Sequence, residues 1–208
     1  MKFISFILPV GLSLAPSLVF SQQIVAQGTF NNTTYLAVLA PNGISWTGAE
    51  ASAVAMGGQL ASDTSAAEDH FLYGLATSSS QLWVYQTGTG VQPGLGPWLG
   101  GYLGSSGWAW IDGSSFSYSN WAPGEPNNWG GTEAYMQFYT YDGSLMADTW
   151  NDYPNTTPDP SHLGPDPHGF IVEIVPEMSS SSLFLVGLAF LMVGWRRASA
   201  GASARARA

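Results

Sequence analysis

The side chains of this 208-residue chain that are best suited to chemistry are its carboxylates, which are segregated from its basic residues. All 14 Asp and Glu residues lie between residues 22 and 177, and all five Lys and Arg residues lie outside, so this segment has a formal charge of −14. Carboxylates without an internal counter-charge suit hard cations with oxygen ligands, such as calcium. A negative surface that only keeps the protein soluble is the alternative.

The same composition excludes several classes of function. A segment without one basic side chain cannot neutralise phosphates, so we expect no nucleic-acid partner. The chain has no cysteine, which excludes thiol catalysis and thiolate metal sites. We find no nucleophile elbow, zinc-binding helix motif or phosphate loop. A pair of acids for glycoside hydrolysis remains open, but we expect the protein not to be an enzyme.

Both ends of the chain read as targeting segments. Residues 1–21 contain Lys2 and an apolar run from Phe3 to Phe20, which is typical of a secretory signal peptide. A short membrane anchor is the alternative. Near the other end, Ser179–Trp195 is uncharged and is followed by two arginines. A membrane span needs about 20 apolar residues, and arginines after it stay on the cytoplasmic side.

The segment 176–197 resembles the PEP-CTERM sorting signal. The chain reads Val175-Pro176-Glu177-Met178, then the apolar stretch and Arg196-Arg197, with a short basic tail at 198–208. Met178 replaces the usual second proline, and the tail is longer than usual. The resemblance implies transient membrane anchoring through the C-terminal helix, cleavage by an exosortase-like enzyme, and a cell-surface or extracellular-matrix location. A plain single-span anchor is the alternative.

Between these ends, the pattern predicts two helices followed by short strands, an α+β arrangement. Ser45 caps a helix over residues 46–56, which Gly57-Gly58 ends. Ser65 and Glu68 form a capping box that opens the second helix. Strands are expected at Ile24–Leu39, Gln81–Tyr85, Trp98–Tyr102, Glu133–Tyr139 and Phe170–Ile174, separated by long Gly- and Trp-rich loops.

Several motifs share their order and spacing with one family. They are Trp46-x-x-Ala49-x-x-x-Ala53-x-x-x-Gly57-Gly58-x-Leu60, Glu68 with Phe71-Leu72, Trp98-Leu99-Gly100-Gly101, Trp108-x-Trp110-x-Asp112-Gly113, Trp121-x-x-Gly124-Glu125-Pro126-Asn127-Asn128, Trp150-Asn151-Asp152 and Phe170-Ile171-Val172-Glu173. Residues 28–175 thereby resemble a C-type lectin-like domain. The resemblance implies two helices, short antiparallel strands and a long calcium- and ligand-binding loop.

Two pairs of positions depart from that family. Ala53 and Val172 stand where the family has one disulfide, and Tyr135 and Asn155 stand where it has the other. We expect an apolar contact to replace the first bridge at little cost in packing.

The resemblance also implies a single calcium ion with five protein ligands. The matching positions are Glu125, Asn127, Glu133, Asn151 and Asp152. The family's proline between the first two ligands is Pro126 here, and we expect its peptide bond to be cis. The alternative is that these Asn-, Asp- and Pro-rich stretches are only turns.

In the family, two neighbouring sugar hydroxyls bind the calcium ion. Glu125 and Glu133 would accept hydrogen bonds from them, and Asn127 and Asn151 would donate. The Glu-Pro-Asn order goes with mannose-type sugars that have equatorial 3- and 4-hydroxyls. Trp129, in the same loop, would either stack on a sugar ring or pack.

The sequence thus predicts calcium-dependent binding of a carbohydrate or exopolysaccharide. A lectin-like module that binds no sugar and serves in protein contact or matrix scaffolding is the alternative, because fold does not dictate function.

Overall fold

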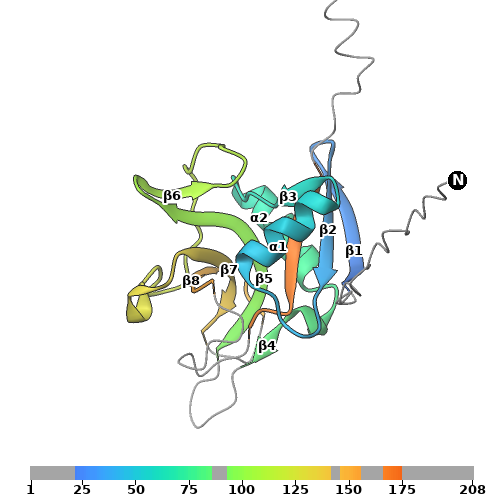
Figure 1. Ribbon diagram of the computed structural model, residues 1–208. Helices are drawn as coiled ribbons and strands as arrows, with labels where there is room; N and C mark the ends of the chain where they lie inside the picture. Colours follow the sequence, from blue (N-terminus) through green and yellow to red (C-terminus); the bar gives the residue numbers. More distant parts are fainter. Residues whose placement is uncertain (1–21, 86–92, 142–145, 156–165, 175–208) are drawn as a thin grey trace, which may run out of the picture.

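The computed structural model describes residues 22–85, 93–141, 146–155 and 166–174 (Figure 1). In these ranges the chain forms two α-helices, two short 3-10 helices and one sheet. In chain order the elements are β1 (Gln23–Phe30), β2 (Thr33–Leu39), α1 (Trp46–Ala55), β3 (Gly58–Leu60), α2 (Ala66–Ala76), η1 (Ser80–Leu82), β4 (Val84–Tyr85), β5 (Gly94–Gly104), β6 (Gly107–Trp110), η2 (Trp129–Gly131), β7 (Tyr135–Thr140), β8 (Trp150–Tyr153) and β9 (Gly169–Ile174).

The main path of the sheet has the strand order β1-β2-β9-β5-β7-β8. The last strand, β9, is antiparallel to β2 on one side and makes a parallel bridge to β5, between Phe170 and Trp98, on the other. Figure 1 shows this strand in orange between the blue N-terminal hairpin and the green β5. The sheet therefore joins the start of the described chain to its end, and it leaves β7 and β8 at the opposite side from β1.

The predicted strand at Ile24–Leu39 is wrong as a single element. The structure has a hairpin, with β1 paired antiparallel to β2 from Gln23 opposite Leu39 to Phe30 opposite Thr33. The two residues between the strands, Asn31 and Asn32, have φ values of 47° and 67°. Asparagine tolerates this left-handed backbone, which two-residue hairpin turns require.

Both predicted helices are present, and their first turns are capped as expected. The Ser45 hydroxyl accepts a hydrogen bond from the Gly48 N–H, and the Ser65 hydroxyl accepts one from the Glu68 N–H, each at 3.2 Å. The Glu68 carboxylate does not return to Ser65 as in a complete capping box. It accepts from the backbone N–H of Thr64 at 2.9 Å and from the Tyr35 hydroxyl at 2.6 Å, so it ties α2 to β2.

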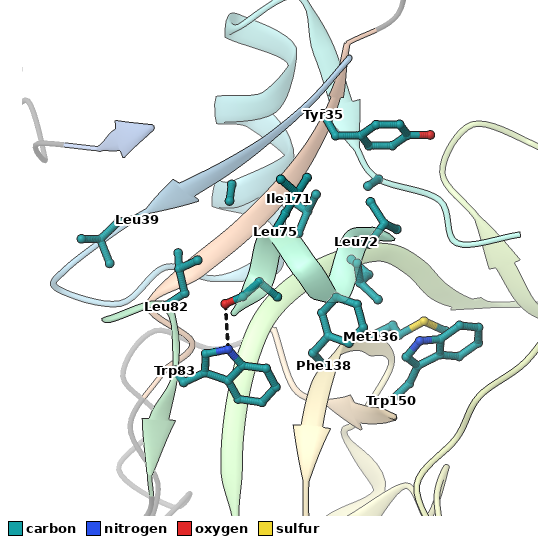
Figure 2. Packing of buried hydrophobic residues seen from close by; sticks show 14 of the residues in the cluster. Tyr35, Leu39, Leu72, Leu75, Leu82, Trp83, Met136, Phe138, Trp150 and Ile171 are labelled. Carbon is teal, nitrogen blue, oxygen red and sulfur yellow. Dashed lines mark hydrogen bonds between the residues drawn. The ribbon is translucent and has the colours of Figure 1, made fainter. Parts of the chain in front are cut away.

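Two apolar clusters fill the core. The first contains Leu72 and Leu75 of α2 with Phe138 and Trp150 of the sheet. Figure 2 shows part of it, including the Trp83 indole that donates to the Ala76 carbonyl at 2.9 Å.

The second cluster contains Trp46 of α1 and Trp98 of β5. Ala53 and Val172, at the positions of the first family disulfide, are both fully buried in it. An apolar contact therefore occupies this place in the fold, as expected.

The strands near the predicted site were the hardest to find in the sequence. β3, β6 and β8 were not among the strands expected from the residue pattern, and β5 is longer than its predicted core at Trp98–Tyr102. β5 passes so close to its neighbours that a Cβ on Gly100 would lie 2.6 Å from the Leu60 carbonyl oxygen. Because no side chain fits at this position, glycine is required there and does not interrupt the strand.

Among the described residues, no helix is long and apolar enough to cross a membrane. The predicted signal peptide (1–21), sorting signal (176–197) and basic tail (198–208) lie outside the described residues.

Two buried aspartates lie under the loop that follows β6. Asp63 is 0% exposed and Asp69, in the first turn of α2, is 2% exposed. Asp69 accepts hydrogen bonds from the Tyr118 hydroxyl and the Asn120 amide, both at 2.7 Å, and so holds this loop against α2. Burial, followed by the negative charge of Asp69, raises the pKa of Asp63 far above its usual range. We therefore expect Asp63 to be protonated in the folded protein at neutral pH.

This protonation makes stability depend on pH. From about pH 4 upward, the folded protein holds a proton on Asp63 that the unfolded chain has lost. The free energy of unfolding should therefore fall as pH rises, by up to about 1.4 kcal/mol per pH unit for one proton. The Asp63→Asn variant should show a flatter profile and greater stability near neutral pH. Urea unfolding at several pH values measures this. The exposed Asp112→Asn control should keep the wild-type slope, and an unchanged slope in Asp63→Asn would contradict the prediction.

Candidate functional site

The antiparallel pair of β7 and β8 brings three of the predicted ligands together. Asn151 lies opposite Gln137 and Asp152 opposite Met136. The contact extends one step beyond the ladder, where the Ala134 N–H donates to the Tyr153 carbonyl at 3.3 Å. Glu133, directly before this residue, therefore lies beside the strand that carries Asn151 and Asp152. All three side chains are buried, although the residue pattern of β8 does not indicate a strand.

The other two predicted ligands are on the loop that joins β6 to β7, and the stem of this loop is fixed to β8. The backbone N–H and carbonyl of Trp150 bond to the Asn120 carbonyl and the Ala122 N–H, both at 2.8 Å. The Trp150 ring is fully buried and packs edge-on to Trp121 and Trp110. The tryptophan that precedes Asn151 therefore anchors both the strand and the loop.

Asp152 closes the loop onto the strand. Its two carboxylate oxygens accept hydrogen bonds from the backbone N–H groups of Asn127 and Asn128, at 3.0 and 2.8 Å. The peptide bond between Glu125 and Pro126 is cis, as the sequence analysis expected. These contacts place Glu125 and Asn127 above the end of β8.

The second half of the loop folds back onto Glu133. The Trp129 N–H donates to Oε2 of Glu133 at 2.7 Å, and the Glu133 N–H donates to Oδ1 of Asn128 at 3.2 Å. Asn128 is left-handed, with φ of 48°, and the Gly131 N–H donates to its carbonyl at 2.9 Å. This short turn, η2, brings Glu133 back toward the part of the loop that carries Glu125, eight positions earlier. Figure 1 shows the turn in yellow beside β7 and β8, on the far side of the sheet from β1.

The site concentrates negative charge that the described residues do not neutralise. Burial, followed by the charge of Asp152, raises the pKa of Glu125 to about 7. Burial also raises the pKa of Glu133 to about 7, against the favourable hydrogen bond from the Trp129 N–H. The environment of both carboxyls thus disfavours their charged form. A nearby cation would favour the charged form and so offset this effect.

The donor atoms at the candidate site are carboxylate and carboxamide oxygens. Oε2 of Glu125 is buried and has no hydrogen-bond partner among the described residues, so a ligand position is open to it. Among the described residues, no group of three or more His, Asp or Glu side chains could hold a metal ion. The carboxamides of Asn127 and Asn151 would add oxygen donors to the carboxylates. Oxygen donors of this mixed kind are those that calcium prefers, so the residues fit the ion.

Trp129 lies at the surface of the same loop. Its side chain is 58% exposed, whereas Trp98 and Trp110 are core residues and Trp108 and Trp121 are partly buried. Trp129 is therefore not part of the buried core, and its side chain lies largely exposed on the loop that carries Glu125 and Asn127.

A separate hollow of about 320 Å³ lies at the start of α1. It is lined by residues 40–45 together with Gln22, Gly48 and Ser52, and none of the predicted site residues contributes to it. The predicted site is therefore a loop surface and is distinct from this pocket.

Comparison with solved structures identifies the architecture. Human lithostathine aligns with a TM-score of 0.52 at 19% identity, over 71% of this chain and 95% of that one. A Ca2+-dependent type II antifreeze protein, in its Ca2+-free form, aligns with a TM-score of 0.50 at 26% identity over the same shares. The chain has the C-type lectin-like fold. The α+β prediction, with two helices and a mainly antiparallel sheet, is confirmed.

Sequence comparison agrees with this assignment. No protein-family model matches the chain. Ladderlectin of Oncorhynchus mykiss is 43% identical over 91 residues, which are 43% of this chain and 42% of that protein. C-type lectin domain family 4 member K of Homo sapiens is 31% identical over 141 residues, 64% of this chain and 36% of that protein. The chain spans less than half the length of each relative.

The role of Asp152 in shaping the loop can be tested without any ligand. In Asp152→Ala the N–H groups of Asn127 and Asn128 lose their acceptors, so their hydrogen exchange should accelerate and unfolding should cost about 1–2 kcal/mol less. Nuclear magnetic resonance or mass spectrometry can follow the exchange. Glu50→Ala, which removes an acceptor from the Leu60 N–H in another part of the fold, should leave this loop unchanged. If the N–H groups of Asn127 and Asn128 exchanged as slowly in Asp152→Ala as in the wild type, the role of this carboxylate would be refuted.

Proposed function

We propose that this domain binds carbohydrate through one calcium ion held by Glu125, Asn127, Glu133, Asn151 and Asp152. The observation that supports the proposal is the closure of the β6–β7 loop onto Asp152 and Glu133, beside a Glu125 carboxyl whose pKa burial and the charge of Asp152 raise to about 7. The names of the relatives support it, because ladderlectin and the human C-type lectin domain protein are lectins by name. The antifreeze protein of the same fold is Ca2+-dependent by its title.

The calcium ion would supply a Lewis-acidic centre for two neighbouring hydroxyls. The chain itself orients them. The ionised carboxylates of Glu125 and Glu133 accept hydrogen bonds from the hydroxyls, and the amides of Asn127 and Asn151 donate to them. Asp152 holds the loop backbone and would add negative charge to the ligands of the ion. Since each hydroxyl meets one acceptor and one donor, the spacing of the two hydroxyls selects the sugar.

The order Glu125-Pro126-Asn127 leads us to a finer proposal, namely mannose-type sugars with equatorial 3- and 4-hydroxyls. Trp129 supports it as an exposed aromatic at the rim, because a sugar presents an apolar face of C–H groups that can pack on an indole. An exopolysaccharide is the polymer that a domain exported to the cell surface would meet. Export, and processing by an exosortase-like enzyme, stay predictions from residues outside the described ranges.

The alternative is a lectin-like module that binds no sugar and acts in protein contact or matrix scaffolding. The same fold occurs in an antifreeze protein, so the architecture alone does not require a sugar. We propose a binding role over an enzymatic one in either case, since the grouped acids and amides are accounted for as ligands.

Calorimetric titration of calcium separates these possibilities. The wild-type protein should show one saturable site, and Glu133→Gln should lose it, because the change removes one of the two charged glutamate ligands. Glu50→Gln, which also removes one carboxylate from the domain, should bind as the wild type does. No binding to the wild type at millimolar calcium would remove the lectin mechanism and leave the scaffolding role.

A variant of Trp129 separates sugar binding from calcium binding. Trp129→Ala should keep the calcium affinity, because the indole is not among the five proposed ligands. It should weaken retention on immobilised mannose in calcium by about fivefold, which corresponds to an aromatic contact of about 1 kcal/mol. Elution by a chelator confirms that retention depends on the ion. Full retention by the variant would show that the indole does not contact the sugar.

A further inference from the structure

Gln137, in the middle of β7, is a polar residue without an evident structural role. Its side chain is 0% exposed, and neither Oε1 nor Nε2 has a hydrogen-bond partner among the described residues. An amide buried without a partner is costly, and an apolar side chain of similar length would usually serve the core better. A residue that opposes stability in this way calls for another function.

The direction of the Gln137 side chain follows from its neighbours on the strand. Met136 and Phe138 belong to the apolar cluster beneath α2, whereas Tyr135 and Tyr139 belong to or pack against the cluster on the other face. Successive side chains of a strand alternate between faces. Gln137 therefore lies on the face of Tyr135 and Tyr139, between two tyrosines.

Asn151 is the cross-strand neighbour of Gln137 on this face. The register pairs Gln137 with Asn151 and Tyr135 with Tyr153, and Tyr153 also belongs to the second cluster. Directly opposite residues have Cβ atoms about 4.5–5.5 Å apart, so the two carboxamides are within reach of each other.

The neighbour on the other side of Gln137 is Trp98 of β5. Its indole N–H already donates to the Ile44 carbonyl at 2.7 Å. The Trp98 indole N–H therefore does not donate to Gln137. Asn151 is the cross-strand neighbour whose side-chain amide can form a hydrogen bond with Gln137.

We propose that Gln137 is a positioning residue that orients the Asn151 carboxamide toward the cation. The Asn151 amide has one acceptor oxygen and two N–H protons. When its Oδ1 is turned to the ion, one Nδ2 proton reaches Oε1 of Gln137 and the other stays available to a sugar hydroxyl. Gln137 thus fixes which end of Asn151 faces the ion, as partners behind metal ligands commonly do. This inference rests on the calcium site proposed above.

A positioning role and a structural role predict opposite results for Gln137→Met. Methionine has similar length and no amide, so the calcium-free variant should melt at the same temperature as the wild type or higher. Its calcium affinity should fall about 10-fold, which is the lower end of the effect of removing a partner behind a metal ligand. The experiment measures melting without calcium and calcium binding by calorimetry on the same samples.

The matched control is Phe138→Leu, on the opposite face of the same strand. It should melt lower and keep its calcium affinity, since Phe138 packs in the core against Tyr73. The positioning role would be overturned if Gln137→Met kept the calcium affinity of the wild type. It would also be overturned if the calcium-free variant melted at a lower temperature than the wild type. Failure of the wild type to bind calcium would instead refute the proposed function, so the two failures are distinguishable.

Discussion

The structure depends on carboxylates that have no basic side chain to pair with. Between residues 22 and 177 there is no Lys or Arg, so a buried acid must either keep its proton, as we expect for Asp63, or be stabilised by hydrogen-bond donors of other kinds. Backbone N–H groups do this for Glu50, Glu68 and Asp152, and a hydroxyl and a side-chain amide do it for Asp69. Because a backbone donor is fixed in the chain, each acid that it satisfies also fixes a segment of chain. The acids of this domain therefore hold its loops in place.

This constraint is strongest at the candidate site. Asp152 takes the N–H groups at the start of the turn and Glu133 takes one at its middle, so the loop is shaped by the same acids that face the ion position. Glu125 differs, since its buried Oε2 has no partner among the described residues. Burial, together with the neighbouring negative charges, raises its pKa and that of Glu133. The hydrogen bonds made by the acids of the domain therefore define the shape of this loop.

The sequence predicted the parts of the fold that depend on local chemistry. Ser45, Ser65 and Gly57 mark the helix ends. The strands β3, β6 and β8 were missed because they are short and are held by neighbours far away in sequence. Neither Asp63 nor Gln137 could be recognised as buried, because a polar residue in a strand or loop gives no signal until its surroundings are known. The loop geometry around Asp152 likewise depends on backbone donors that no side-chain pattern encodes.

The central position of β9 has a consequence for how the domain is assembled. The N-terminal hairpin and the strands that carry the candidate site make their principal connection through this strand, which is synthesised after all the other described strands. Pairing between distant segments is slow, because the chain loses loop entropy before the contacts form. Until residues 169–174 are available, β2 and β5 present unpaired edges of the kind that associate with other chains. The polypeptide is therefore most vulnerable to aggregation before β9 has joined the sheet.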